Sequence, residues 1–180
     1  HNGRRRQRQM CIRDSVEDRK VAFKERSLIY RQYSKGTDNK SDLIYFHGGG
    51  FVVGGLESHD DICAEICEST GCNVFSLDYS LAPEVKYPDF FLDAIRFYYF
   101  IKNPERRLIL VGDSAGGTLA GFVANKVRNV SIRPEAQVLI YPDLAGDISE
   151  TSKRKFFDAP LLTQDDIYFY HSCAGLPAKK

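Results

Sequence analysis

One serine of this chain lies in a setting that could make it a nucleophile. The segment Gly112-Asp113-Ser114-Ala115-Gly116-Gly117 matches G-x-S-x-G, with the apolar run 108–111 before it and a helix-like stretch after it. A serine on a tight turn between strand and helix projects its hydroxyl above the sheet, and the glycines let the flanking backbones crowd together. The amino end of the helix offers N–H groups where negative charge develops during acyl transfer. The pattern therefore favours Ser114 as a nucleophile over the alternative, a plain glycine-rich turn.

A second glycine run could supply the hydrogen-bond donors that such a reaction needs. His47-Gly48-Gly49-Gly50-Phe51 directly follows the short apolar run 43–46. Consecutive glycines let the backbone fold against a substrate and aim N–H groups at an oxyanion about 3 Å away. The alternative is a loop that cradles phosphate, but no Lys-Ser/Thr pair follows and the spacing does not match G-x-G-x-x-G. The sequence therefore favours an oxyanion hole.

Both motifs follow expected strands, in a chain that alternates strands with amphipathic helices. Such alternation predicts βαβ units and a mostly parallel sheet, that is, an α/β fold. Helical spacing is clearest around Phe90, Ala94, Phe97 and Ile101. The expected strands are 27–33, 43–46, 73–77, 108–111 and 137–141, and the expected helices are 59–69, 89–102, 115–128 and 161–172.

Five motifs in this order resemble the hormone-sensitive-lipase family of esterases, which has the α/β-hydrolase fold. They are HGGGF at 47–51, DYSLAPE at 78–84, YP at 87–88, GDSAGG at 112–117 and YP at 141–142, and the match covers nearly all of residues 21–172. The resemblance implies a doubly wound, mostly parallel sheet, incomplete at both ends. It also implies a serine hydrolase that cleaves small or medium acyl esters without a cofactor. A non-catalytic relative that binds a small ligand and a peptidase of the same fold stay open as alternatives.

The resemblance also implies a role for each matching residue. Ser114 would be the catalytic nucleophile, and the oxyanion N–H groups would come from Gly49, Gly50 and Ala115. His47 would shape the glycine loop rather than act as the base. The residues that would support the loop and the turn are Gly48, Asp113, Tyr79 and Glu84. The family usually has arginine where this chain has Ser80, so we expect a salt bridge near this position to be missing.

The acid and the base of a catalytic triad are not identified among these motifs. In this fold the chain order is Ser, then Asp or Glu, then His. His171 is the only histidine after Ser114, and it lies on a helix that we expect to form part of a lid or crossover. We expect Asp143, Asp147 and Asp158 to be solvated loop carboxylates. The chain is therefore interpreted as a fragment, truncated at both ends, nearly inactive, and poorly soluble because an apolar sheet edge is exposed.

Residues 5–15, RRQRQMCIRDS, resemble a translated sequencing adapter of the transposon-based type. We therefore expect residues 1–15 to be non-native and disordered, and Val16 to lie inside the gene. The alternative is a basic arm that binds nucleic acid or anionic lipid. Residues 16–180 would then form a partial α/β-hydrolase domain that contains the N-terminal and nucleophile half.

The net charge and the cysteine content limit the classes of partner and ligand that we expect. Residues 1–15 hold five Arg and one Asp, so the remaining chain has 20 basic and 23 acidic residues, a formal net charge of −3, and no nucleic-acid partner is implied. No apolar run is long enough to span a bilayer. The four cysteines after residue 15 do not match the spacing of a zinc site, so we expect no bound metal. We expect these cysteines to be buried free thiols, which fits a reducing compartment and therefore a cytoplasmic location. The expected partner is a small ester, and a homo-oligomer of the full-length protein stays open.

Overall fold

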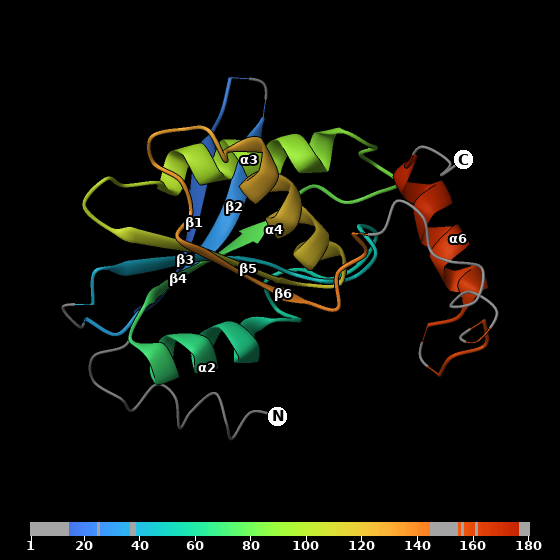
Figure 1. The fold of residues 1–180 in the computed structure, drawn as a ribbon, viewed down its shortest axis with the longest axis horizontal. Coiled ribbons are helices and arrows are strands. Elements are labelled where there is room, and N and C mark those ends of the chain that lie inside the picture. The colour runs from blue at the N-terminus through green and yellow to red at the C-terminus, as the bar shows by residue number, and fades with distance from the viewer. Residues whose placement is uncertain are drawn as a thin grey trace.

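A six-stranded sheet forms the centre of the computed structural model, which describes residues 15–24, 26–36, 39–144, 155, 157–160 and 162–176 (Figure 1). The strand order is β1-β2-β4-β3-β5-β6. Strands β4, β3, β5 and β6 run parallel, and β2 and β1 add two antiparallel strands at one edge. The bounds are β1 Ser15–Ala22, β2 Ser27–Ser34, β3 Ser41–Phe46, β4 Asn73–Asp78, β5 Arg107–Asp113 and β6 Ala136–Ile140.

Helices cover both faces of this sheet. Figure 1 shows α2 (Asp60–Thr70) below the sheet, α3 (Asp89–Ile101) and α4 (Ala115–Lys126) above it, and α6 (Gln164–Ala174) to one side. Gly71 ends α2 with a φ of 69°, and Thr163 begins α6 by accepting a hydrogen bond from the N–H of Asp166. None of the described helices is both long and apolar enough to cross a membrane.

The core has two parts, one on each face of the sheet. Strand β3 is buried along its whole length, so its side chains feed both parts alternately. Ile44 and Phe46 pack with α3 and α4, whereas Tyr45 packs on the α2 side. The α2 side also contains the thiols of Cys63, Cys67 and Cys72, whose predicted burial is confirmed, and Cys173 of α6 is half-buried.

The mostly parallel α/β fold predicted from the sequence is confirmed, with two kinds of difference. The predicted elements shift at their ends: α4 ends at Lys126 rather than 128, and the last helix begins at Gln164 rather than 161. Strand β1 was not predicted, because only Val21 of its eight residues is buried and its sequence has no alternating pattern. Residues 1–14, nearly all of the predicted adapter segment, lie outside the described residues.

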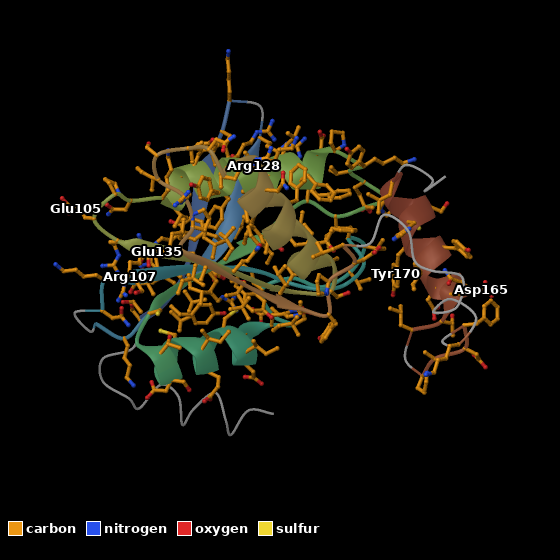
Figure 2. The ribbon with its side chains drawn as sticks, viewed as in Figure 1. Glu105, Arg107, Arg128, Glu135, Asp165 and Tyr170 are labelled. Atoms are coloured by element: carbon orange, nitrogen blue, oxygen red, sulfur yellow. The ribbon has the colours of Figure 1, made fainter. Side chains whose placement is uncertain are left out.

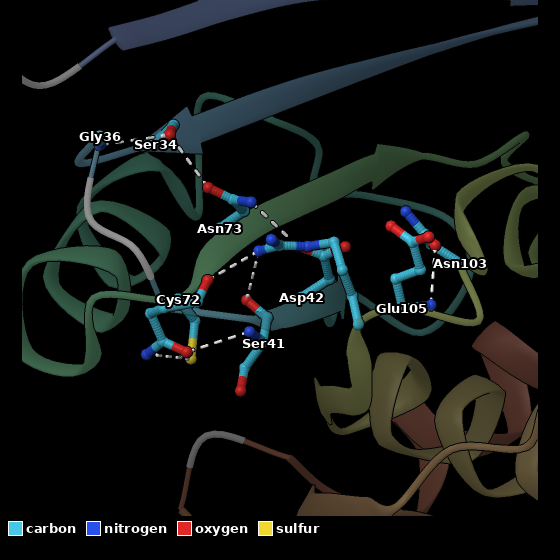
Figure 3. A network of polar contacts seen from close by, with 10 residues as sticks. Ser34, Gly36, Ser41, Asp42, Cys72, Asn73, Asn103 and Glu105 are labelled. Carbon is cyan, nitrogen blue, oxygen red and sulfur yellow. Dashed lines mark hydrogen bonds and ion pairs between the residues drawn. The ribbon is translucent and has the colours of Figure 1, made fainter.

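A polar network ties the sheet together at the end away from the glycine motifs (Figure 3). Asp42, at the start of β3, accepts hydrogen bonds from Asn73 at 2.9 Å and from Arg106 at 2.8 Å. Ser34, at the end of β2, donates to Asn73 at 2.9 Å. These bonds fix the amino ends of β3 and β4. The two glycine motifs follow the opposite, carboxyl ends of β3 and β5.

Candidate active site

The two glycine motifs begin side by side at the carboxyl ends of two neighbouring central strands. Strands β3 and β5 are parallel neighbours, and Phe46 pairs with Gly112 in their register. The loop that follows β3 and the turn that follows β5 therefore leave the sheet at the same level. A Cβ atom on Gly116 would overlap the carbonyl oxygen of Phe46, so the start of α4 packs directly on the end of β3. This close packing needs glycine.

Ser114 occupies a sharp turn between β5 and α4. Its φ is 51° and its ψ is −121°, a left-handed conformation that a non-glycine residue rarely adopts. Its N–H donates to the carbonyl oxygen of Ile140 at 2.8 Å, which ties the turn to β6. Strain held in this way by surrounding structure is typical of functional positions. Within the described part of the chain, no side chain forms a hydrogen bond with Ser114 Oγ, and the residue is half-buried.

The glycine loop folds into a tight turn beside this serine. Gly49 has a φ of 123° and Gly50 a φ of 62°. The carbonyl oxygen of Gly49 accepts hydrogen bonds from the N–H groups of Val52 and Val53, both at 3.0 Å. Among the described residues, no acceptor takes the N–H of Gly49 or of Gly50. Ala115 is the first residue of α4, where N–H groups have no acceptor inside the helix. All three predicted donors are therefore available.

Helix α6 places an aromatic ring against the glycine loop. A Cβ atom on Gly50 would lie 2.5 Å from Cγ of Tyr170, so the ring rests on the Cα of this glycine. Figure 2 shows Tyr170 on the side of α6 that faces the sheet. The helix is held in place by a hydrogen bond from the N–H of Tyr87 to the carbonyl oxygen of Ala174, at 2.9 Å. Sequence reasoning missed Tyr170, because nothing in residues 164–174 indicates what they pack against.

Asp113 links the turn to the glycine loop. Its carboxylate accepts a hydrogen bond from the N–H of Gly48 at 3.0 Å and one from the hydroxyl of Tyr45 at 2.9 Å, and His59 Nε2 lies 3.3 Å away. Burial alone would raise the pKa of Asp113, but the hydrogen bonds from His59, Tyr45 and Gly48 outweigh burial and hold the pKa below its ordinary value. Asp113 therefore stays ionised and anchors Gly48.

His47 lies inside the protein rather than at the serine. Its ring is fully buried and stacks on Tyr79 with 4.3 Å between ring centroids, and Nδ1 donates to the carbonyl oxygen of Gly48 at 2.8 Å. Nε2 has no hydrogen-bond partner in the described structure. Burial lowers the pKa of His47 to about 4, so the ring is neutral at physiological pH. The arrangement fits a residue that shapes the loop.

Tyr79 and Glu84, the remaining residues predicted to support the loop and the turn, lie in different positions relative to the site. The hydroxyl of Tyr79 donates to the carbonyl oxygen of His47 at 2.8 Å, so Tyr79 holds the loop directly. Glu84 is exposed, and in the part of the chain that the structure describes no hydrogen bond or ion pair connects it to the site. The structure thus brings Tyr79 to the glycine loop and leaves Glu84 outside.

The other histidines are engaged with partners of their own. His59 Nδ1 lies 2.8 Å from Ser58 Oγ and its Nε2 faces Asp113, so Ser58, His59 and Asp113 form a connected series of polar contacts. The hydroxyl of Ser58 also lies 2.9 Å from the carbonyl oxygen of Gly55, so His59 Nδ1 and this carbonyl oxygen are both acceptors within reach of its one proton.

Asp143 is an exposed loop carboxylate, as expected from the sequence, and it also has partners. His171 Nε2 lies 3.2 Å from Asp143 Oδ2, and Asp143 also exchanges backbone hydrogen bonds with the hydroxyl of Thr118. In a serine triad, Nε2 faces the serine and Nδ1 faces the acid, so this pair presents the wrong nitrogen to its carboxylate. Asp158 is exposed, and Asp147 lies outside the described residues.

The described residues contain no group of three His, Cys, Asp or Glu side chains that could hold a metal ion. The candidate site consists of Ser114 in a strained turn, the N–H groups of Gly49 and Gly50 without an acceptor among the described residues, and the ring of Tyr170. Together they can hold a carbonyl group, accept negative charge on its oxygen and place a hydroxyl beside its carbon.

The chain is similar in sequence to proteins of one fold family. A family model described as "alpha/beta hydrolase fold" matches residues 43–179. An ethyl acetate hydrolase of Pseudomonas putida is 35% identical over 150 residues, which cover 77% of this chain and 46% of that protein. An acetyl esterase of Salmonella paratyphi B is 33% identical over 150 residues, covering 78% of this chain and 46% of that protein. The chain thus spans about half the length of these curated relatives.

A solved structure has a similar fold. An esterase from Pyrobaculum calidifontis is 31% identical and superposes with a TM-score of 0.79 over 88% of this chain and 56% of that chain.

Proposed function

Since the chain belongs to the α/β-hydrolase fold family, as an esterase-like member of the hormone-sensitive-lipase type, we propose that it carries the nucleophile and the oxyanion hole of a carboxylic-ester hydrolase. One observation carries this proposal: Ser114, at a φ of 51°, stands beside a loop in which Gly49 and Gly50 keep unoccupied N–H groups. Unoccupied donors beside a serine hydroxyl are what acyl transfer requires, and the strain held at the serine supports a functional role for it.

The proposed reaction is hydrolysis in two stages. Ser114 Oγ attacks the carbonyl carbon of an ester, a new C–O bond forms, and the carbonyl π electrons move to the oxygen. The N–H groups of Gly49, Gly50 and Ala115 hold this oxyanion. Its collapse breaks the bond to the alkoxy group, which leaves as an alcohol with the proton from Ser114. Water then attacks the acyl-serine in the same way, and the acid is released with Ser114 restored.

The proton from Ser114 needs a base, and none of the described histidines is placed to take it. His47 is buried and bonded to Gly48, His59 lies between Ser58 and Asp113, and His171 offers Nε2 to Asp143. We therefore propose that this chain, on its own, is nearly inactive. Positioning and an oxyanion hole without a base leave roughly 10³–10⁴-fold catalysis over water in a comparable triad enzyme.

The proposed substrates are esters of small or medium acyl groups. The names of the relatives, an ethyl acetate hydrolase and an acetyl esterase, support a short acyl chain. The ring of Tyr170 on Gly50 supports the same conclusion, because it narrows the space next to the oxyanion donors. The competing function is that of a ligand-binding relative, which would keep the glycine loop and bind a small acid without cleaving anything.

Acylation of Ser114 in the presence of an added base tests the proposal. The chain would be incubated with p-nitrophenyl acetate and increasing concentrations of imidazole, which can act as the missing base. Peptide mass spectrometry would locate the acetyl group. We expect acetylation of Ser114 that rises with imidazole, disappears in Ser114→Ala and persists in the control Ser58→Ala.

The opposite result is equally clear. If the protein stays folded and Ser114 remains unmodified at every imidazole concentration, the esterase proposal is wrong. Binding of acetate or of a larger carboxylic acid, measured by calorimetry, would then favour the ligand-binding function.

A further inference from the structure

A fully buried carboxylate lies behind the loop that follows β4. Asp93 of α3 has no exposed surface. It accepts hydrogen bonds from Arg96 at 3.2 Å and from the N–H of Ser80 at 3.3 Å. A charge at this depth is stable only if cations and donors surround it. The strongest candidate for the compensating cation comes from a distant part of the chain.

Arg26 reaches this carboxylate from the connection between β1 and β2. Its guanidinium group lies 3.3 Å from both oxygens of Asp93, 3.4 Å from Ser80 Oγ and 2.7 Å from Asp89. A planar guanidinium can donate in several directions at once, which lysine cannot match. Arg26 thus connects the β1–β2 hairpin, the loop after β4 and helix α3 through a single group.

The loop after β4 is in turn attached to the glycine loop at both ends. The hydroxyl of Tyr79 donates to the carbonyl oxygen of His47, and the N–H of Ala82 donates to the carbonyl oxygen of Phe51, both at 2.8 Å. Ser80 lies between these two attachment points. Any displacement of Ser80 therefore moves the supports of the segment that contains Gly49 and Gly50.

We propose that Arg26 is a positioning residue for the oxyanion loop, acting through Ser80 and Asp93; this inference rests on the proposed function. It also corrects an expectation. The chain has Ser80 where the related family usually has arginine, and we expected a salt bridge near this position to be missing; the structure nevertheless has one, because Arg26 pairs with Asp89 and Asp93.

Hydrogen exchange in the full chain, read by mass spectrometry, tests this inference without any chemistry at Ser114. Truncation of Arg26 should loosen the glycine loop. In Arg26→Ala, the N–H groups of Val52 and Val53 should therefore exchange roughly tenfold faster than in wild type, while the N–H groups of strand β5 should keep their slow exchange. Arg26→Ala with Ser80→Arg should restore slow exchange, because the guanidinium group returns beside Asp93. Arg19→Ala is the matched control, since Arg19 pairs with Glu17 on the exposed face of β1.

Several outcomes would overturn the inference. It is wrong if Arg26→Ala changes only the global stability, or if added Ser80→Arg leaves the loop in fast exchange. If Arg26→Ala does not fold, Arg26→Lys takes its place. Lysine keeps the charge but cannot reach Ser80, Asp89 and Asp93 together, so a smaller acceleration is expected and an unchanged loop contradicts the inference.

The same variants separate this inference from the proposed function. Imidazole-assisted acetylation of Ser114 should slow about tenfold in Arg26→Ala and recover with Ser80→Arg. If exchange responds and wild-type Ser114 is never acetylated, the proposed function fails and the link from Arg26 to the loop stands. If Ser114 is acetylated equally in all variants, the proposed function stands and the positioning role fails.

Discussion

Because His47 is buried, we expect the free energy of unfolding to fall as the pH is lowered. Burial lowers the pKa of His47 from its ordinary value of 6.5 to about 4, against the opposing effect of the bond to Gly48. A proton therefore binds the unfolded chain more readily than the folded protein between these values. The stability contributed by neutral His47 is complete above pH 6.5, and it is lost as the pH falls towards 4.

The size of this effect follows from the same two values. Each pKa unit corresponds to about 1.4 kcal/mol, so the gap between 6.5 and about 4 amounts to about 3 kcal/mol lost at pH 4. Total unfolding free energies of single domains are roughly 5–15 kcal/mol. The loss caused by this one histidine would thus be a large fraction of the total stability of a single domain.

Urea unfolding at pH 7, 6, 5 and 4 would measure this loss in wild type and in His47→Gln. Glutamine does not titrate, and the other ionisable groups are shared, so the difference between the two proteins isolates His47. Wild type should lose about 3 kcal/mol more than the variant between pH 7 and pH 4. Parallel curves would refute the reasoning. So would an NMR titration of the wild-type ring with a midpoint near 6.5, a measurement that does not depend on whether the variant folds.

Two further predictions test the packing of the turn and the state of the thiols. Gly116→Ala should cost several kcal/mol of unfolding free energy, because its Cβ would overlap backbone at the end of β3. Gly121→Ala on the same helix meets only the ends of two leucine side chains, the nearer at 3.1 Å, and should stay within about 1 kcal/mol of wild type; equal losses in urea unfolding would contradict this. Maleimide should label half-buried Cys173 well before Cys63, since burial raises the pKa of the Cys63 thiol to about 12, and peptide mass spectrometry showing the reverse order would disprove it.

Much of the fold could be predicted from the sequence, because its signals are local. The apolar runs of β3 and β5, the spacing of apolar residues in α3 and the glycines at the strand ends each act over a few residues. They place Ser114 at a strand-to-helix turn and the glycine loop after a parallel neighbour. Strand β1 shows the limit of this reasoning, since its exposed residues carry no pattern and only its pairing with β2 defines it.

The residues of the candidate site also differ in how far the sequence alone could predict them. The types and spacing of its residues by themselves predicted a nucleophilic serine and a glycine loop that could donate to an oxyanion, because glycine allows the tight turns that both motifs need, and the resemblance to a family then implied the individual donors. Only the tertiary structure decided that Tyr170 covers Gly50, that His59 faces Asp113 and that Arg26 reaches Asp93. These residues lie 54 to 120 positions apart in each pair, and no local preference encodes such contacts. They arise when the helices and loops pack on the sheet and buried charges find their partners.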